Sequence, residues 1–263
     1  MLRILFIGDV MGSPGRRALS RMLGALRSRL GVRLVIANGE NVAGGLGITK
    51  PTAIAILDTG VDVITLGNHS FSKKDMLGYI ESEPRILRPA NYPPGVPGRG
   101  WGVFETSSGD RVAVANLAGR TFMAPLDCPF RAADAILSEI GGDPNVLVVD
   151  MHAEATSEKV AMGWCLDGRA SAVIGTHTHV QTSDERVLPG GTAYITDAGM
   201  TGVHDSVLGL DKNVVIGRFL TQVSGKFALA EGPATLQGVV IELDSETGRA
   251  ASIERVSVGE GEL

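Results

Sequence analysis

Eight polar side chains in this sequence have the types and positions expected of a metal centre. Each follows one of five short apolar segments whose composition predicts a β-strand. Carboxylate, amide and imidazole groups together suit a borderline divalent ion such as zinc, manganese or iron. The eight residues are Asp9, Glu40, Asn41, Asn68, His69, His152, His177 and His179.

The number of candidate ligands predicts two metal ions. All of these residues except His69 are candidate ligands, which is too many for one tetrahedral ion. His177 and His179 would point to the same side of an extended chain and could both serve one site. Glu40 has two carboxylate oxygens and can bridge two ions, which lie about 3.5–4 Å apart in such sites. With only Asp9 and Glu40 negative, the site would attract an anion and acidify bound water.

Each residue also has a purely structural interpretation. The Asp after the first strand can cap a turn, and Asn68 and His69 can be turn residues. His152 can be a buried histidine with its hydrogen bonds satisfied, and Glu40-Asn41 can cap a loop. The recurrence of these residue types at five strand ends favours a site over these separate explanations. Asp150 is expected to orient its neighbours and not to bind metal.

The segments that carry these residues alternate with helical patterns. Strands expected at 2–7, 33–37 and 62–66 alternate with helices at 14–30, 49–60 and 73–81. This βαβαβα order is typical of a parallel sheet covered by helices, where ligands bind at the carboxyl ends of the strands. Further strands are expected near 101–105, 112–116, 146–149, 172–174, 192–195, 238–243 and 252–258, with helices near 131–140 and 157–166.

The later strands predict a second sheet. The Pro/Gly-rich stretch 93–100 is not a linker between domains, because candidate ligands lie on both sides of it and both halves must build one site. We therefore expect an α/β fold, an αββα four-layer sandwich of two mixed sheets flanked by helices. One domain is expected over residues 1–263, with residues 258–263 as a loose tail.

Composition excludes several classes of protein. The chain of 263 residues has a formal net charge of −5, so it lacks the basic surface that binds duplex nucleic acid. Its two cysteines fit a reducing compartment, which predicts a cytoplasmic protein. No run of about 18 apolar residues predicts a membrane-spanning helix. The sequence leaves open whether the chain forms a homo-oligomer.

Six separate blocks of the sequence resemble one known family. They are GDVMG (8–12), ENVAGG (40–45), GNH (67–69), HAEATSEK (152–159), GTHTH (175–179) and DAGMTG (197–202). Their types and order resemble the calcineurin-like metallophosphoesterases, and most closely the YmdB-type branch, over nearly the whole chain. The superfamily usually has Asp-x-His at the first strand and Gly-Asp at the second. Here Met11 and Glu40-Asn41 stand instead, and the branch shares both changes.

The resemblance implies a two-metal phosphodiesterase that also acts on 2′,3′-cyclic nucleotides. A hydroxide between the ions attacks phosphorus, and His69 is the general acid that protonates the leaving group. The implied metals are iron or manganese, with zinc as a further candidate, and Asn41 replaces the missing histidine. The implied ligands are Asp9, Glu40, Asn41 and His179 for the first ion, and Glu40, Asn68, His152 and His177 for the second.

The implied partner is a small-molecule phosphodiester or nucleotide. The alternative is a regulatory protein that binds metal and nucleotide with little turnover. An intact His69 and a full ligand set favour the enzyme.

Overall fold

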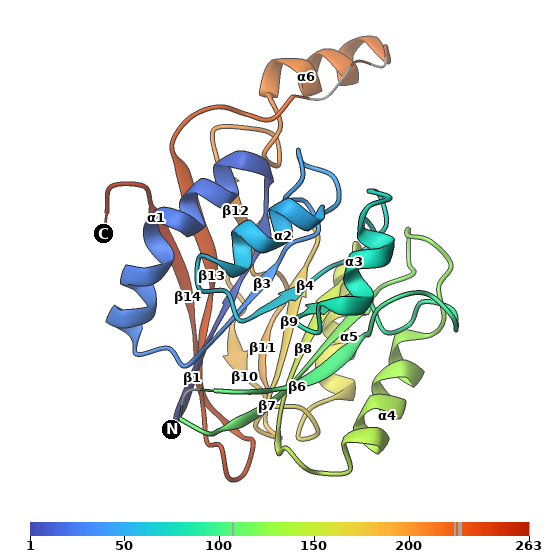
Figure 1. Cartoon of the computed structure of the whole chain (residues 1–263), viewed down its shortest axis with the longest axis vertical. Coiled ribbons are helices and arrows are strands. Elements are labelled where there is room, and N and C mark those ends of the chain that lie inside the picture. The colour runs from blue at the N-terminus through green and yellow to red at the C-terminus, as the bar shows by residue number, and fades with distance from the viewer. Residues whose placement is uncertain (107, 224, 226–227, 263) are drawn as a thin grey trace.

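The computed structural model describes residues 1–106, 108–223, 225 and 228–262. Within them it contains six helices and fourteen strands, and the strands form two sheets. Figure 1 shows the strands gathered at the centre of the molecule and the helices at its outside.

The larger sheet is built around the first three predicted strands. Four of its strands run parallel, and the C-terminal hairpin pairs with them antiparallel through β13. Its strand order is β2-β12-β13-β1-β3-β4-β5, with β14 beside β13. The strands are β1 (Leu2–Ile7), β2 (Asp9–Val10), β3 (Leu34–Asn38), β4 (Val63–Thr65), β5 (Ile86–Leu87), β12 (Met200–Val203), β13 (Ala234–Leu243) and β14 (Ala250–Gly259).

The smaller sheet comes from the middle of the chain. Its order is β10-β11-β9-β8-β7-β6, with a parallel centre and an antiparallel strand at each edge. The strands are β6 (Trp101–Glu105), β7 (Arg111–Ala118), β8 (Val146–His152), β9 (Ala172–Thr176), β10 (Arg186–Val187) and β11 (Ala193–Ile195).

Alternating side chains sort the molecule into four layers. In β1, Ile4 and Phe6 face the smaller sheet and pack with Val148 of β8, in a buried cluster that lies between the sheets. The intervening Leu5 and Ile7 pack on the other face, in a cluster with α1 (Gly12–Leu30), α2 (Lys50–Leu57) and α3 (Met76–Ser82). The smaller sheet packs its outer face on α4 (Pro129–Ile140) and α5 (Thr156–Cys165). The predicted αββα sandwich of two mixed sheets is confirmed.

Local signals in the sequence account for individual helix ends. Thr49 is the N-cap of α2 and accepts a hydrogen bond from the Thr52 backbone N–H, and Gly31 ends α1 with a positive φ of 64°. The first helix begins at Gly12, earlier than the predicted 14, and Met11 occupies its N-cap. The short strands β2, β5, β10 and β12 and the helix α6 (Lys212–Thr221) were not predicted.

The expected loose tail over residues 258–263 is wrong for its first residues. β14 continues to Gly259, which pairs with Thr235 of β13. Glu260 then accepts hydrogen bonds from the Ala234 backbone N–H at 2.9 Å and from Arg17 Nε at 3.0 Å. These bonds hold the chain end against α1. No helix in the described part of the chain is long and apolar enough to cross a membrane.

Candidate metal centre

The side chains predicted from the sequence meet between the two sheets, at the carboxyl ends of five strands. The two sheets contribute different donor atoms. The larger sheet supplies oxygen donors from the start of β2, which follows β1 directly, and from the ends of β3 and β4, and the smaller sheet supplies imidazoles from the ends of β8 and β9. The oxygen donors are on Asp9, Glu40, Asn41 and Asn68, and the imidazoles are those of His152, His177 and His179.

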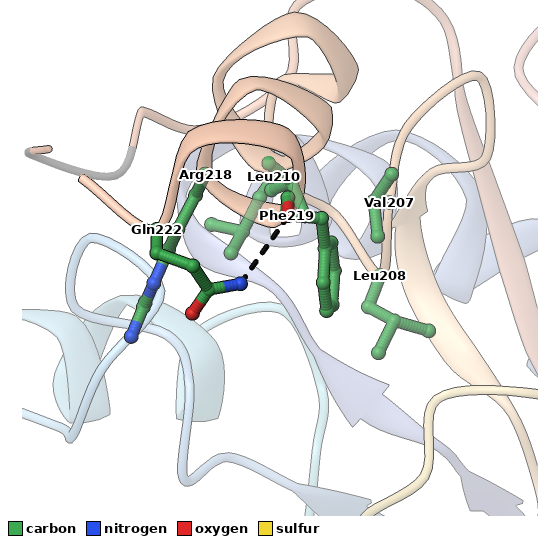
Figure 2. A pocket seen from close by; sticks show the side chains of 7 residues that line it. Val207, Leu208, Leu210, Arg218, Phe219 and Gln222 are labelled. Carbon is green, nitrogen blue, oxygen red and sulfur yellow. Dashed lines mark hydrogen bonds between the residues drawn. The ribbon is translucent and has the colours of Figure 1, made fainter. Parts of the chain in front are cut away.

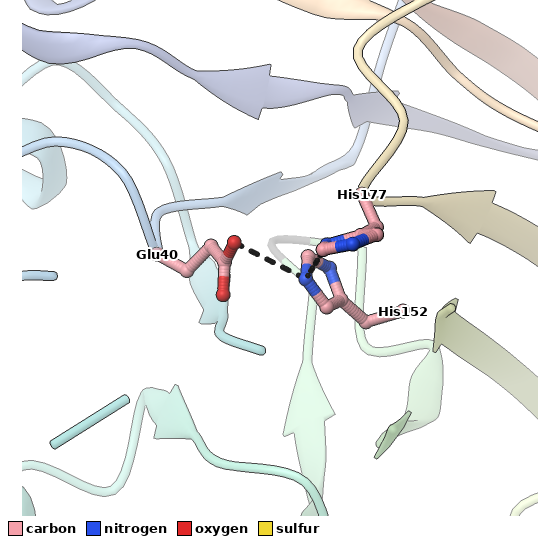
Figure 3. Close-up of side chains that lie close together, drawn as sticks. All are labelled: Glu40, His152 and His177. Carbon is pink, nitrogen blue, oxygen red and sulfur yellow. Dashed lines mark hydrogen bonds and ion pairs between the residues drawn. The ribbon is translucent and has the colours of Figure 1, made fainter. Parts of the chain in front are cut away.

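One imidazole nitrogen is the centre of the first group. His152 Nε2 lies 3.1 Å from Glu40 Oε1 and 3.0 Å from Asn68 Oδ1. His177 Nδ1 lies 3.0 Å from the same nitrogen (Figure 3). A ring nitrogen donates at most one hydrogen bond, so it cannot satisfy three acceptors. Ligands about 2.1 Å from one octahedral ion are about 3 Å apart, so these spacings fit a shared cation.

The second group lies around His179. Its Nε2 is 3.1 Å from the Asn41 amide nitrogen and 3.7 Å from Asp9 Oδ1. Asp9 Oδ1 is buried and has no hydrogen-bond partner among the described residues, which is costly unless a cation binds there. The Asn41 amide nitrogen also faces Glu40 Oε1 at 3.2 Å. Rotating that amide by 180° would present its oxygen to the same place.

Glu40 connects the two groups. Its Oε1 faces both His152 and Asn41, while its Oε2 accepts a hydrogen bond from the His69 backbone N–H at 3.0 Å. A Cβ at Gly67 would collide with the His152 ring and with Glu40 Oε2. Glycine therefore lets the end of β4 approach the two ligand candidates closely.

His177 and His179 reach the site by a turn and not from an extended strand. β9 ends at Thr176, and both histidines have a positive φ, 95° and 63°. The expectation that both point to the same side of an extended chain is therefore wrong. Such backbone conformations are strained in non-glycine residues and cluster at functional sites.

A buried relay holds His152. Its Nδ1 lies 2.8 Å from Thr176 Oγ1, which donates to Asp150 Oδ1 at 2.6 Å. Asn38 donates to the other oxygen of Asp150 at 3.0 Å. Asp150 thus orients its neighbours, as predicted, but the relay through Thr176 was missed. The Gly-Thr-His-Thr-His spacing was its only signal, because it places that threonine directly before a histidine.

Two more contacts orient the remaining histidines, and sequence reasoning missed both. His177 Nε2 lies 3.1 Å from Glu154 Oε2, which leaves its Nδ1 facing His152. His179 Nδ1 lies 3.2 Å from the Leu208 carbonyl oxygen, which leaves its Nε2 facing Asn41. Metal-binding histidines commonly make such a second hydrogen bond. Glu154 lies in the HAEATSEK block, but the carbonyl of Leu208 has no signal in the sequence.

The pKa values in this cluster follow from burial and from neighbouring charge. Burial raises the pKa of Asp9 to about 6, although the histidine charges of His179 and His152 oppose it. Burial would also raise the pKa of Glu40, but contact with His152 outweighs it and lowers that pKa to about 2. The pKa of His152 rises to about 9 for the same reason, because Glu40 outweighs burial. Burial and the His152 charge lower the pKa of His177 to about 3, so this imidazole is neutral.

A cavity of about 330 Å³ opens at the cluster. Glu40, Asn41, His69, His177 and His179 are among its lining residues. Among the described residues that line it, none is Lys or Arg. The cavity therefore exposes the candidate metal ligands together with one further histidine, His69. An anion that enters it would meet no Lys or Arg among the described lining residues.

Comparison with known proteins identifies the family. The model of the YmdB-like protein family matches residues 5–256. The chain belongs to the YmdB-like family. It is 48% identical over 262 residues to a Bacillus subtilis protein named 2′,3′-cyclic-nucleotide 2′-phosphodiesterase, covering 100% of this chain and 99% of the relative.

Solved structures agree with this YmdB-like membership. A Mycoplasma pneumoniae protein described as a novel phosphatase matches with a TM-score of 0.92 at 32% identity, covering 98% of this chain and 93% of that one. The calcineurin-like phosphoesterase YfkN of Bacillus subtilis matches with a TM-score of 0.56 at 12% identity, covering 98% and 90%. The second likeness concerns the fold alone, and it confirms the calcineurin-like sandwich.

The fold of this YmdB-like chain implies divalent metal ions, and its residues fit them. Donor atoms of Glu40, His152 and His177 all lie within 4.8 Å of one another (Figure 3). The unpartnered Asp9 Oδ1 and the three acceptors around His152 both favour bound cations.

A second, apolar cavity borders the candidate metal centre of this YmdB-like chain. It has a volume of about 380 Å³ and lies between α6 and residues 207–210 (Figure 2). Leu208 and Leu210 line both cavities. Since Leu208 also holds His179 through its carbonyl, this segment forms the wall between the two spaces.

Proposed function

We propose that this chain is a dinuclear-metal-dependent phosphodiesterase that hydrolyses small phosphodiesters, including 2′,3′-cyclic nucleotides. The observation that carries the proposal is the convergence of Glu40, Asn68 and His177 on His152 Nε2. The name of the Bacillus subtilis relative, which is 48% identical, supports the choice of substrate.

Two ion positions share Glu40 in this proposal. A donor set of imidazoles with carboxylate and amide oxygens suits iron or manganese, with zinc as a further candidate. When bound, such ions stabilise negative charge on the phosphoryl oxygens and lower the pKa of water that attacks phosphorus. The proposed ligands are Asp9, Glu40, Asn41 and His179 at the first position, and Glu40, Asn68, His152 and His177 at the second.

His69 is the proposed general acid. It lines the cavity beside the ligand candidates, and its backbone N–H is fixed by Glu40. The Asn68 amide nitrogen lies 3.3 Å from His69 Nε2, a contact that helps to orient the ring. We propose that the imidazolium form of His69 donates its proton to the leaving oxygen and becomes a neutral imidazole.

The charge of the cavity favours diesters over monoesters. A phosphodiester carries one negative charge, whereas a monoester carries close to two at neutral pH. With Glu40 and Glu154 in the described lining and no Lys or Arg there, the second charge of a monoester has little to neutralise it.

The proposal includes one domain over residues 1–263, since each ion position takes ligands from both sheets. It also includes a cytoplasmic location, which the free cysteines Cys128 and Cys165 support. A regulatory protein with little turnover is not favoured, because His69 and the full ligand set are intact.

The test is metal content measured together with turnover. Protein purified anaerobically without chelator should hold close to two ions per chain and hydrolyse 2′,3′-cyclic nucleotides. Full activity with one ion per chain would refute the shared role of Glu40. Two ions without turnover on any phosphodiester would refute the enzyme and support the regulatory alternative.

A further inference from the structure

Two of the family-like blocks meet in a buried ion pair. Lys159 ends the HAEATSEK block and Asp197 begins the DAGMTG block. Lys159 Nζ lies 2.9 Å from Asp197 Oδ2, and the two side chains are 1% and 0% exposed. Neither residue is a proposed ligand. Burying two charges removes them from water, and apolar replacements are often as stable, so stability alone does not explain this pair.

Both partners of the pair bond to the segment that carries the two histidines. Lys159 Nζ donates to the Thr176 carbonyl oxygen at 3.1 Å and lies 3.5 Å from Thr178 Oγ1. Asp197 Oδ2 accepts from the Thr178 backbone N–H at 3.1 Å and from its hydroxyl at 2.6 Å. The ion pair is therefore hydrogen-bonded to the backbone on both sides of His177.

This segment needs an external support. His177 and His179 have positive φ, a conformation that persists only where the surroundings impose it. A Cβ at Gly175 would collide with the Thr196 carbonyl oxygen and contact the Lys159 side chain, so the lysine packs directly on the start of the turn. The pair is thus one of the interior contacts that hold the strained turn, beside the hydrogen bond that the His177 backbone N–H donates to Asp9 Oδ2 at 3.0 Å.

We propose that Lys159 and Asp197 are positioning residues that hold the 176–179 turn so that His177 and His179 face the two metal positions before metal binds. Neither residue touches substrate or metal. The inference rests on the proposed function in one respect, because it takes His177 and His179 as metal ligands.

The decisive variant is the double substitution K159M/D197N. Either single substitution leaves a buried charge without its partner and can prevent folding. The double variant has no unpaired charge, so the melting temperature of its metal-free form should exceed that of both single variants. Its affinity for Mn²⁺ should still fall about 10–100-fold at both positions, because the turn has lost the ion pair that holds its backbone.

Two further variants separate positioning from stability. T178V keeps both charges and removes only the hydroxyl, so its Mn²⁺ affinity should fall about 2–10-fold. L26A lowers stability from the last turns of α1, where Leu26 is buried on the face of the larger sheet that points away from the smaller sheet, and should leave Mn²⁺ affinity unchanged. Mn²⁺ affinity would be measured by calorimetry on metal-free protein.

Amide hydrogen exchange of residues 176–179 in metal-free protein gives a readout that needs no activity. Exchange should quicken in the double variant and stay unchanged in L26A. Wild-type Mn²⁺ affinity in the double variant or in T178V, or equal losses in L26A, would overturn the inference. Turnover failure in a wild-type protein that binds Mn²⁺ would instead refute only the proposed function.

Discussion

Replacing Thr176 by Val removes one buried hydroxyl that connects His152 to Asp150. Thr176 Oγ1 lies 2.8 Å from His152 Nδ1 and 2.6 Å from Asp150 Oδ1, and all three residues are 0% exposed. Valine has nearly the same shape as threonine, so T176V tests the hydrogen bonds and creates little cavity.

The expected cost follows from the two groups that lose a partner. A buried polar group left unsatisfied costs about 1–3 kcal/mol. Asn38 still bonds to Asp150 Oδ2 at 3.0 Å and lies 3.4 Å from His152 Nδ1, which keeps the sum in the lower half of its range of about 2–6 kcal/mol. A loss of about 3 kcal/mol lowers the melting temperature by about 6–12 °C at this chain length. Metal affinity at the position that includes His152 should fall about 10–100-fold.

Thermal unfolding of metal-free protein and Mn²⁺ titration measure the two effects separately. T176S keeps the hydroxyl and is the matched control, so its metal affinity should remain close to wild type. The position around His179 should keep its affinity in both variants. Wild-type Mn²⁺ binding in T176V, or an equal loss in T176S, would refute the relay as the support of His152.

Four further predictions concern the ligands, the acid, the substrate and a distant carboxylate. E40Q should weaken both ions and H152A mainly one, so identical metal loss by elemental analysis would contradict the shared role of Glu40. H69N should keep its metals but lose about 10²–10⁴-fold in turnover of a 2′,3′-cyclic nucleotide, and much less with a nitrophenyl diester whose leaving group needs no proton. A 2′,3′-cyclic nucleotide should be hydrolysed faster than the matching monophosphates, and faster phosphate release from the monoesters would count against the charge argument. Burial would raise the pKa of Asp184, but hydroxyl hydrogen bonds from Thr182 and Thr196 outweigh it and hold that pKa below 3.8. Its charge therefore stabilises the fold above about pH 4, so D184N should cost about 1 kcal/mol at pH 7 and less at pH 3 in urea unfolding.

The ligand-bearing strands could be predicted because their signals are local and physical. Continuous apolar runs marked β1, β3, β4, β8 and β9 as buried strands, and parallel strands end at one edge. Residues far apart in the sequence could therefore be assigned to one candidate site from the sequence alone. The short strands were not predicted because two to four residues show no clear hydrophobic periodicity. The helix α6 was not predicted because few of its side chains are buried, so its hydrophobic pattern is weak.

The backbone of the site could not be predicted in the same way. Positive φ at His177 and His179 contradicts the preference of non-glycine residues, so it arises from tertiary contacts. The carbonyl oxygen that holds His179 belongs to Leu208, and any residue type would supply it. Thr176 and Glu154 became recognisable as supports only when the fold placed them beside histidines.

The division of donor atoms between the sheets explains why the site depends on the whole sandwich. Both proposed ion positions combine oxygens from the larger sheet with imidazoles from the smaller one. The distance between these donors is therefore set by the apolar layer between the sheets, where Phe6 and Ile36 pack in one cluster with Val148 and Ile174. Bound metal would join the two sheets and stabilise their packing in turn, because ligands that bind only the folded state shift the folding equilibrium. Since Phe6 and Ile174 each lie within three residues of a proposed ligand, the layer that holds the sheets together also sets the spacing of the metal centre.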